Sequence, residues 1–382
     1  MGKISLLSTW RKPLRRVIRK WLSNGYDIDA LDAVLATAMA HRLGGDPLWL
    51  MLVSGPGAAK TETVQVLAGM GAMVTSTIAS EGALLSAVPK RNRTKEASGG
   101  LLSRIGDDGI LVFKDFTTIL SMDRHVRGAT LAALREIHDG RWQRNVGTDG
   151  GRTLTWEGRL TVIGAVTTAW DSAYAVVGAM GDRFLLVRIN SYENREQIGR
   201  QAIRNIGREK EMRNELAAAV AALFAEPAEV VGEVDEAEFL AIADFVTLAR
   251  TTTDVDSRGN VLDAHAPEAP TRFAKQLAQL ARGAMAIGLN YAEAERLAIR
   301  CARDSVPPVR LQLLQDIDAH PGTTLSSICG RLNKPKTTIE RHLAALQLLG
   351  LVSAEKAKNT WGYKCGPRLN SKGLRLIARE CG

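Results

Sequence analysis

The sequence predicts an α/β protein in which helices cover a parallel sheet, followed by a helical stretch and a small C-terminal module. Three observations support this fold class. The apolar run Leu48–Ser54 stops at a glycine-rich turn, which is typical of a strand buried on both faces. Short strand-like segments then alternate with helical or loop segments as far as residue 190. Beyond Asn190 the apolar spacing is helical, and we expect no strand until the C-terminal end.

Each element follows from its local pattern. Four more strands are expected after the first one, over Met73–Ile78, Ile110–Phe113, Leu160–Val166 and Phe184–Ile189. Helices are expected over Asp27–Arg42, Glu193–Phe224, Glu236–Thr251 and Thr271–Gly288. Together with the break at Pro307-Pro308, these elements predict four segments. The segments are a basic helical segment (1–45), an α/β core (46–190), a helical lid (191–305) and a C-terminal module (306–382).

The length and the charge distribution limit the possible functions. A chain of 382 residues is too long for one ordinary core, so two or three domains are expected. The net charge of +9 is concentrated at the two ends. Residues 1–22 hold seven basic and no acidic residues, and residues 309–382 hold twelve basic against five acidic, which leaves −5 between them. This distribution favours polyanion-binding ends, although basic ends that only maintain solubility are equally compatible with it.

Two absences point to the compartment. No run of eighteen apolar residues and no secretory signal occur, so we expect a cytoplasmic protein that does not enter a membrane. The cysteines form no CxxC pair and no spacing typical of a zinc site, and we interpret them as reduced thiols. They are Cys301, Cys329, Cys365 and Cys381.

The turn after the first strand has the composition of a phosphate-binding loop. It reads Ser54, Gly55, Pro56, Gly57, Ala58, Ala59, Lys60, Thr61, and a helical run follows it. Small residues let backbone N–H groups surround a phosphate, Lys60 can reach the β- and γ-oxygens, and Thr61 can bind Mg²⁺. Ser54 and Ala59 stand where the pattern has glycine, and a positive φ at Ala59 would cost about 1 kcal/mol. The loop predicts ATP and Mg²⁺ binding; the alternative is an ordinary strand-to-helix turn.

A second segment, Gly109–Phe116, is an apolar strand that ends in a carboxylate and resembles a Walker B motif. With Leu131–Trp142 after it, the chain resembles the AAA+ P-loop ATPases over about residues 46–305. Within that family it is similar to the branch of minichromosome maintenance helicases and bacterial enhancer-binding activators. The resemblance implies an AAA+ parallel-sheet core with a helical lid.

The Walker B resemblance has two registers. In one, Asp115 is the Mg²⁺-side aspartate and Phe116 replaces the catalytic glutamate. In the other, Lys114 replaces the aspartate and Asp115 takes the place of the glutamate. Either register lacks one of two acids, so slow hydrolysis is expected.

The resemblance also assigns roles to single residues. Thr167, after the strand Leu160–Val166, stands where the family has its sensor-one residue. Arg183 in Gly181–Phe184 is similar to the arginine finger, and Arg272 to the sensor-two arginine; the alternative for both is a surface ion pair. A finger acts on a neighbouring subunit's ATP, so the resemblance implies a homo-oligomeric ring, expected to be a hexamer. Gly147–Trp156 is similar to a hairpin that touches DNA in helicases of this branch. The basic stretch Pro89–Lys95 stands where the branch can insert a DNA-facing or partner-facing loop; the alternative is a solvated basic loop.

The C-terminal module resembles bacterial winged-helix regulators. Helices are expected over Val309–Ala319, Thr324–Leu332 and Lys336–Leu349, and paired strands over Leu351–Ala354 and Thr360–Lys364. In that fold the start of the third helix enters the major groove of DNA, and the wing contacts the backbone. The candidate DNA-binding residues are Lys336, Thr337, Thr338, Arg341, Lys356 and Lys358, with His342 a weaker candidate. A protein-binding role for the module is the alternative.

Three functions are compatible with these features. The first is an ATP-dependent DNA remodeller of a phage or mobile element: a replication initiator, helicase or helicase loader. The second is a DNA-binding transcriptional regulator in which ATP acts as a switch with weak or no turnover. The third, a polymerase-remodelling activator, lacks the GAFTGA-like loop of that group between residues 62 and 108. It ranks last.

Overall fold

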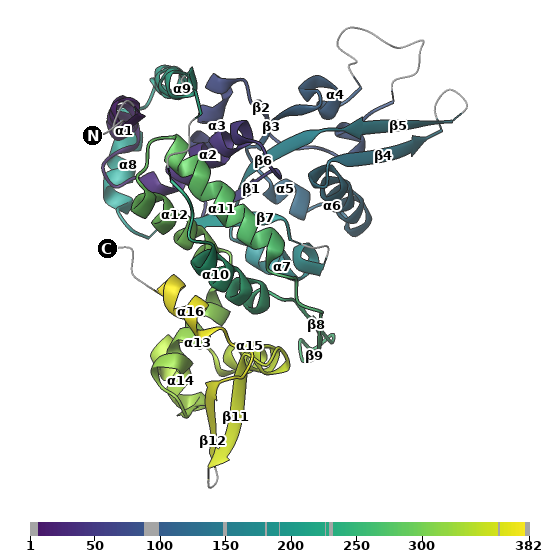
Figure 1. Ribbon diagram of the computed structural model, residues 1–382, viewed down its shortest axis with the longest axis vertical. Helices are drawn as coiled ribbons and strands as arrows, with labels where there is room; N and C mark the ends of the chain where they lie inside the picture. Colours follow the sequence, from purple (N-terminus) through teal and green to yellow (C-terminus); the bar gives the residue numbers. More distant parts are fainter. Residues whose placement is uncertain are drawn as a thin grey trace. The chain divides into compact units, whose positions relative to one another are not determined.

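The computed structural model describes residues 7–87, 99–147, 151–179, 182–190, 192–225, 227–228, 232–357 and 360–378. The chain forms two compact units (Figure 1). The first unit comprises residues 1–173, 183–232 and 279–297, and the second comprises 174–182, 233–278 and 298–382. The limits of these units differ from the segment boundaries expected at residues 190 and 305, because the second unit is made of three separate stretches of the chain.

A five-stranded parallel sheet forms the centre of the first unit. The strand order is β2-β3-β6-β1-β7. The strands are β1 (Trp49–Val53), β2 (Met73–Thr75), β3 (Asp108–Phe113), β6 (Arg159–Val166) and β7 (Phe184–Arg188). All five residues of β1 are buried, as the apolar run predicts for a strand that has neighbours on both sides and helices on both faces. The α/β class and the five expected strands are thereby confirmed.

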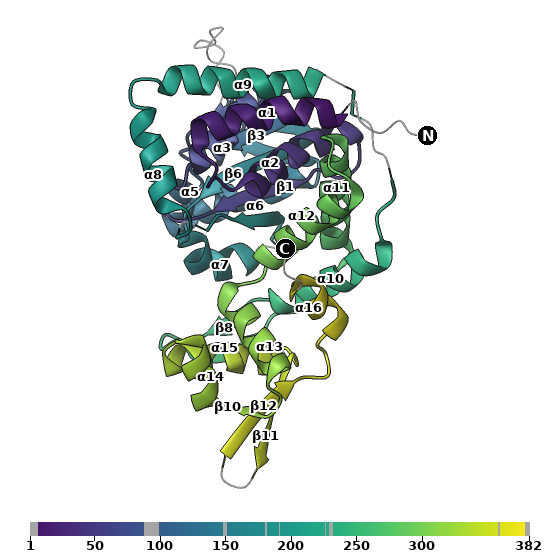
Figure 2. The same cartoon turned by 90° about the vertical axis from the view of Figure 1, so that its left-hand side faces the viewer.

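Helices surround this sheet, and Figure 2 shows α1 lying beside α9. Helix α2 packs on β1, β6 and β7, while α3 packs on β3 and β6. The α-helices of the first unit are α1 (Leu7–Leu22), α2 (Ile28–Ala40), α3 (Lys60–Gln65), α4 (Leu101–Ile105), α5 (Thr117–Leu120), α6 (Arg124–His138), α8 (Arg195–Arg204) and α9 (Glu209–Ala225). Short 3-10 helices are η1 (His41–Leu43), η2 (Val66–Met70) and η3 (Glu81–Ala83). Three further helices have residues in both units: α7 (Ala169–Ala179), α11 (Thr271–Ala286) and α12 (Tyr291–Asp304).

A separate antiparallel hairpin follows α6. It consists of β4 (Arg141–Val146) and β5 (Arg152–Glu157), which pair from Arg141 with Glu157 to Val146 with Arg152. The strands therefore start earlier than the expected segment Gly147–Trp156, whose residues 148–150 lie outside the described part of the chain.

The second unit contains α10 (Glu236–Ala249) and the C-terminal elements. Three helices and a three-stranded sheet of order β10-β12-β11 form a module closed by a last helix. The elements are α13 (Pro308–Ala319), β10 (Thr323–Thr324), α14 (Leu325–Leu332), α15 (Lys336–Leu348), β11 (Val352–Ala357), β12 (Thr360–Cys365) and α16 (Ser371–Ala378). These bounds agree closely with the elements expected from the sequence.

The stretch between residues 191 and 305 differs from the expectation: the helix expected over Glu193–Phe224 is two helices, α8 and α9, and the stretch is not helical throughout. Strands β8 (Thr253–Val255) and β9 (Val261–Ala264) form a second antiparallel hairpin. The strands have three and four residues, too few for a period-2 pattern to be distinguished from a loop. Val255 and Leu262 are apolar but exposed, so these strands do not have the pattern of a strand with one buried face.

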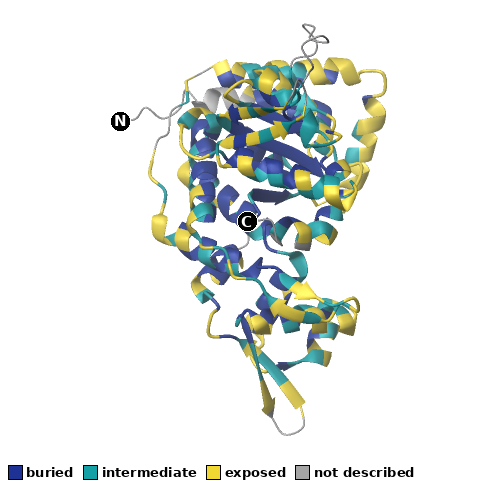
Figure 3. Ribbon diagram, turned by 90° about the vertical axis from the view of Figure 1, so that its right-hand side faces the viewer, coloured by how far each residue is buried: buried dark blue, intermediate teal, exposed yellow. Residues whose placement is uncertain are grey.

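Buried residues concentrate in the sheet strands and in the helices that cover them (Figure 3). In the described part of the chain, no helix is both long enough and apolar enough to span a bilayer.

Close packing of α11 on α2 gives a prediction. A Cβ at Gly283 would lie 2.0 Å from the Ala36 carbonyl oxygen, whereas a Cβ at Gly128 in α6 would meet no atom within 4 Å. Gly283→Ala should therefore destabilise the protein by about 1–3 kcal/mol, because a backbone carbonyl must move. Gly128→Ala should stabilise it by up to about 1 kcal/mol through helix propensity. Denaturant unfolding measures both, and a stabilising Gly283→Ala would contradict the α2–α11 packing.

Candidate functional site

The loop between β1 and α3 has the conformation that its sequence requires. Gly57 has a φ of +81° and Ala59 a φ of +55°, so two residues of the loop are left-handed. Ala59 therefore has the positive φ whose cost for an alanine was considered from the sequence. Helix α3 begins at Lys60 and receives no hydrogen bond from a side-chain cap, which leaves its first N–H groups available to an anion.

Lys60 lies across this loop. Its Nζ donates hydrogen bonds to the carbonyl oxygens of Ser54, at 3.0 Å, and Gly55, at 2.7 Å. Burial lowers the pKa of the ammonium group, and the negative charge of Asp115 opposes that shift. A phosphate placed in the loop would offer the ammonium group a stronger, charged acceptor than the two carbonyls.

Three predicted site residues meet at the carboxyl edge of the sheet. Because β1, β3 and β6 are parallel neighbours, the residues that follow them lie along one edge. The Asp115 Oδ1 accepts a hydrogen bond from the Thr117 N–H at 3.0 Å. The Thr117 hydroxyl in turn accepts one from the Thr167 N–H at 3.1 Å and lies 3.4 Å from the Thr167 hydroxyl. The fold therefore joins Asp115 to Thr167 through Thr117, a residue that the motif analysis did not nominate.

The aromatic neighbour of Asp115 belongs to the core. Phe116 is fully buried, and its ring centroid lies 5.6 Å from that of Phe113 and 5.7 Å from that of Phe184. Asp115 itself is exposed, and Lys114 is half-buried. Asp115 is the acidic residue present in both registers of this motif. Its negative charge acts on the ammonium group of Lys60.

A cavity of about 530 Å³ opens beside the loop. Residues of the loop form one wall, and α1, the α1–α2 connection, α8 and α9 contribute the others. Its lining includes Trp21, Tyr26, Ile198, Asn190, Gln201 and Asn205, together with Pro56 to Ala59. This size falls within the range of small-molecule sites, and the mixture of apolar and amide side chains is typical of such sites.

Sequence reasoning missed this cavity. Tyr26 is fully buried, its hydroxyl lies 2.5 Å from that of Thr63, and burial raises its pKa. The Trp21 indole N–H donates to Glu215 at 2.8 Å. Tyr26 lies 37 positions from Thr63, and Trp21 lies 194 positions from Glu215, so no local pattern connects these pairs. Only the folded chain brings them to one place.

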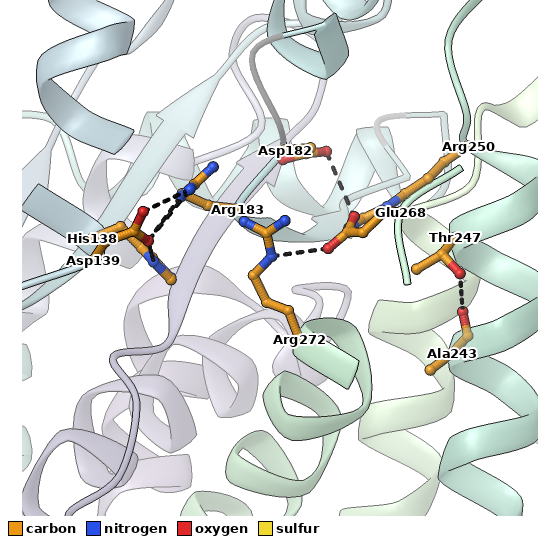
Figure 4. Close-up of polar contacts among 9 residues, drawn as sticks. All are labelled: His138, Asp139, Asp182, Arg183, Ala243, Thr247, Arg250, Glu268 and Arg272. Carbon is orange, nitrogen blue, oxygen red and sulfur yellow. Dashed lines mark hydrogen bonds and ion pairs between the residues drawn. The ribbon is translucent and has the colours of Figure 1, made fainter. Parts of the chain in front are cut away.

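Arg183, the predicted finger, forms an ion pair with Asp139 at 2.9 Å (Figure 4). The Arg183 side chain is 11% exposed. Burial favours the neutral form of Asp139, but hydrogen bonds from Arg183 and His138 outweigh it, so the carboxyl pKa is lowered. Arg183 precedes β7, which runs parallel to β1, so it lies at the opposite edge of the sheet from Lys60. A five-residue strand separates those edges by about 16 Å.

Arg272, the predicted sensor-two residue, lies in the second unit at the start of α11. Its Nε donates to Glu268 at 2.8 Å, and Glu268 also accepts from the buried Arg250 at 2.7 Å (Figure 4). Burial alone would raise the pKa of Glu268, but the two guanidinium groups lower it. The ion pair left open as an alternative is therefore present for both arginines.

The candidate DNA-binding residues lie on α15 and β11. Lys336 and Thr337 are exposed at the start of α15, Thr338 is half-buried, and Lys356 is exposed on β11. Arg341 is exposed and donates to the Arg258 carbonyl oxygen at 2.9 Å. The helix start carries no side-chain cap, a favourable position for a phosphate.

His342 is a poor candidate. Burial, with the charges of Arg310 and Lys334, lowers its pKa to about 4, so its ring is neutral at pH 7. Three other predictions, Lys358, the stretch Pro89–Lys95 and Gly181, involve residues outside the described part of the chain.

The left-handed alanine gives a prediction. Ala59→Gly should raise the free energy of unfolding by up to about 1 kcal/mol, because glycine removes the strain of a positive φ. Ala58 is absent from the positive-φ residues, so Ala58→Gly should lower stability by about 0.5–1 kcal/mol. Thermal unfolding compares the two variants, and equal shifts would contradict the conformation of the loop.

No protein-family model and no curated protein matches this chain. Its function therefore has to be inferred from the contacts of Lys60, Asp115 and their neighbours.

Proposed function

We propose that this protein is an ATP-dependent DNA-remodelling protein of the AAA+ type that binds DNA through a C-terminal winged helix. A replication initiator, a helicase or a helicase loader of a phage or mobile element fits this description. The observation that carries the proposal is the meeting of Lys60, Asp115 and Thr167 at one sheet edge, beside a cavity of about 530 Å³.

The residues at this edge suit a nucleoside triphosphate. Left-handed Gly57 and Ala59 curl the backbone of the loop, and the uncapped start of α3 offers N–H groups to phosphate oxygens. Lys60 would exchange its two carbonyl acceptors for phosphate oxygens. The cavity lined by Tyr26 and Asn205 has room for the nucleoside.

The same residues suit Mg²⁺, which prefers oxygen ligands and retains several waters. Thr61 is exposed at the start of α3 and Asp115 is exposed after β3, and their oxygens would hold the ion with the phosphates. The ion would neutralise charge on the phosphate oxygens. Asp115 and the Thr167 hydroxyl are the groups of this edge that can orient an attacking water.

The buried Phe116 supports the second candidate function, a nucleotide-switched DNA-binding regulator. A ring packed against Phe113 and Phe184 offers no acid or base to the edge, so Asp115 stands there without the second carboxylate of the family. One carboxylate has to serve Mg²⁺ and water together, which favours slow turnover. In this candidate, bound ATP would change the DNA affinity without rapid hydrolysis.

The C-terminal module supports DNA binding. Helices α14 and α15 are joined by a short turn in which Asn333 is left-handed, and β11 and β12 form the paired strands of a wing. Lys336 and Thr337 stand exposed on the third helix, and Lys356 on the wing. The excess of seven basic residues over residues 309–382 suits a polyanion.

A ring-shaped oligomer, expected to be a hexamer, would explain Arg183. Its place at the sheet edge opposite Lys60 keeps it from ATP bound by its own chain. To contact ATP on a neighbouring subunit, Arg183 would have to exchange Asp139 for a phosphate. In this proposal, Arg183 leaves Asp139 when it contacts the ATP of a neighbouring subunit in the oligomer.

ATP turnover tests the nucleotide site. Lys60→Ala should abolish ATP binding, because it removes the cation of the loop. Asp115→Ala should abolish hydrolysis, because the loss of a catalytic base lowers the rate by about 100-fold or more. ATP should still bind to this variant. Lys114→Ala is the matched control and should change turnover little. Hydrolysis should be measured with and without single- and double-stranded DNA, and retained turnover in Asp115→Ala would overturn the assignment.

DNA affinity tests the C-terminal module. Lys336→Ala should weaken duplex binding and reduce the slope of log K against log salt by about 1, as the loss of one phosphate contact requires. Lys372→Ala removes the same charge from an exposed position on α16 and should leave the slope unchanged. Fluorescence anisotropy over a salt series measures both, and identical slopes in the two variants would argue against α15 as the DNA-binding element.

A further inference from the structure

The β8–β9 hairpin of the second unit contacts α15, the third helix of the C-terminal module. The β8–β9 hairpin packs on α15, and Figure 1 shows the two elements side by side. The Arg341 side chain donates a hydrogen bond to the Arg258 carbonyl oxygen in the turn of that hairpin, at 2.9 Å. Arg341 is one of the residues assigned above to DNA. The contact occupies an Nη2–H group of Arg341, which is then lost to a phosphate, and it holds the guanidinium group against the hairpin turn.

The turn of the hairpin is shaped for this contact. Gly259 has a φ of +81°, and a Cβ at that position would lie 2.8 Å from the Cζ of Arg341. The absence of a side chain therefore lets the guanidinium group lie against the turn. The Asp256 carboxylate accepts hydrogen bonds from the N–H groups of Arg258 and Asn260, both at 2.8 Å. The turn that receives Arg341 is thus held by its own hydrogen bonds.

The charge of the hairpin distinguishes two possible roles. Residues 253–264 contain three carboxylates, Asp254, Asp256 and Asp263, against one basic residue, Arg258. Asp254 and Asp263 are exposed. An element with this net charge repels DNA phosphates and attracts a basic helix. The hairpin therefore suits covering α15 better than extending its DNA-binding surface.

We propose that the β8–β9 hairpin is an intramolecular inhibitor that competes with DNA for α15 by holding Arg341 and placing negative charge beside the helix. The inference rests on the proposed DNA-binding function. DNA binding at full affinity then requires Arg341 to leave the hairpin turn.

A shortened hairpin in the full-length protein tests this inhibition. Asp254 and Asp263 are cross-strand partners, so residues 255–262 can be replaced by Asn-Gly, which makes a two-residue hairpin turn. This change removes the Arg341 acceptor and keeps the Thr253–Ala264 pair. Affinity for a duplex at fixed salt should rise about tenfold, the order expected for losing a competing hydrogen bond to a charged group.

A point variant with the hairpin intact provides a second test. In Gly259→Ala the new methyl group displaces the Arg341 guanidinium, so DNA affinity should rise in the same direction. Gly322→Ala is the matched control, because Gly322 has a φ of +82° but no atom within 4 Å of its Cβ position. It carries the same backbone strain without touching Arg341, and DNA affinity should not change.

Combining the shortened hairpin with Arg341→Ala separates the outcomes. Arg341→Ala should cost little DNA affinity when the hairpin is intact and several-fold more when it is shortened. If the shortened protein binds DNA no better, or less well, while Lys336→Ala still weakens binding, the inhibition is disproved and DNA binding stands. If no form of the protein binds a duplex, the proposed DNA-binding function fails, and the inhibition fails with it.

Discussion

The parallel alignment of β1, β3 and β6 is the constraint on which the candidate site depends. Parallel strands end at the same edge, so the loop after β1, Asp115 after β3 and Thr167 after β6 converge although more than 100 residues separate the first from the last. The burial of β1 on both faces keeps this alignment fixed, because any slip would expose apolar side chains or break backbone hydrogen bonds. The site is a consequence of the sheet.

The loop after β1 and the segment after β3 each contain a residue that departs from the expected motif. Ala59 accepts a left-handed conformation that costs an L-residue about 1–2 kcal/mol, and the surrounding elements maintain it. Phe116, in contrast, is a core residue. It occupies the place beside Asp115 with a ring that fills the core among Phe113, Trp170 and Phe184. At Phe116, unlike at Ala59, a core ring therefore occupies a position where a polar side chain could have served phosphate chemistry.

Buried arginines organise the second unit. Arg310 in α13 donates to the carbonyl oxygens of Ala249 and Thr251 at the end of α10, at 3.0 and 2.5 Å. Asn370, which precedes α16, donates to Asp244 of α10 at 2.9 Å. Helices α13 and α16 are therefore joined to α10 by buried and partly buried polar contacts, which are costly to break because the groups would lose their partners away from water.

Some features followed from sequence alone because their causes are local. The apolar run Leu48–Ser54 predicted β1, the glycine-rich turn predicted where that strand ends, and helical spacing predicted α13 to α15, since backbone geometry and side-chain period act over a few residues. Other features were decided only by tertiary structure. The Thr117 bridge, the cavity beside Tyr26, the Arg183–Asp139 pair and the Arg341 contact with the hairpin each join residues far apart in the chain. Such contacts leave no periodic trace in a sequence, because either partner alone is an ordinary polar or aromatic residue, and only the packed sheet and helices determine which residues meet.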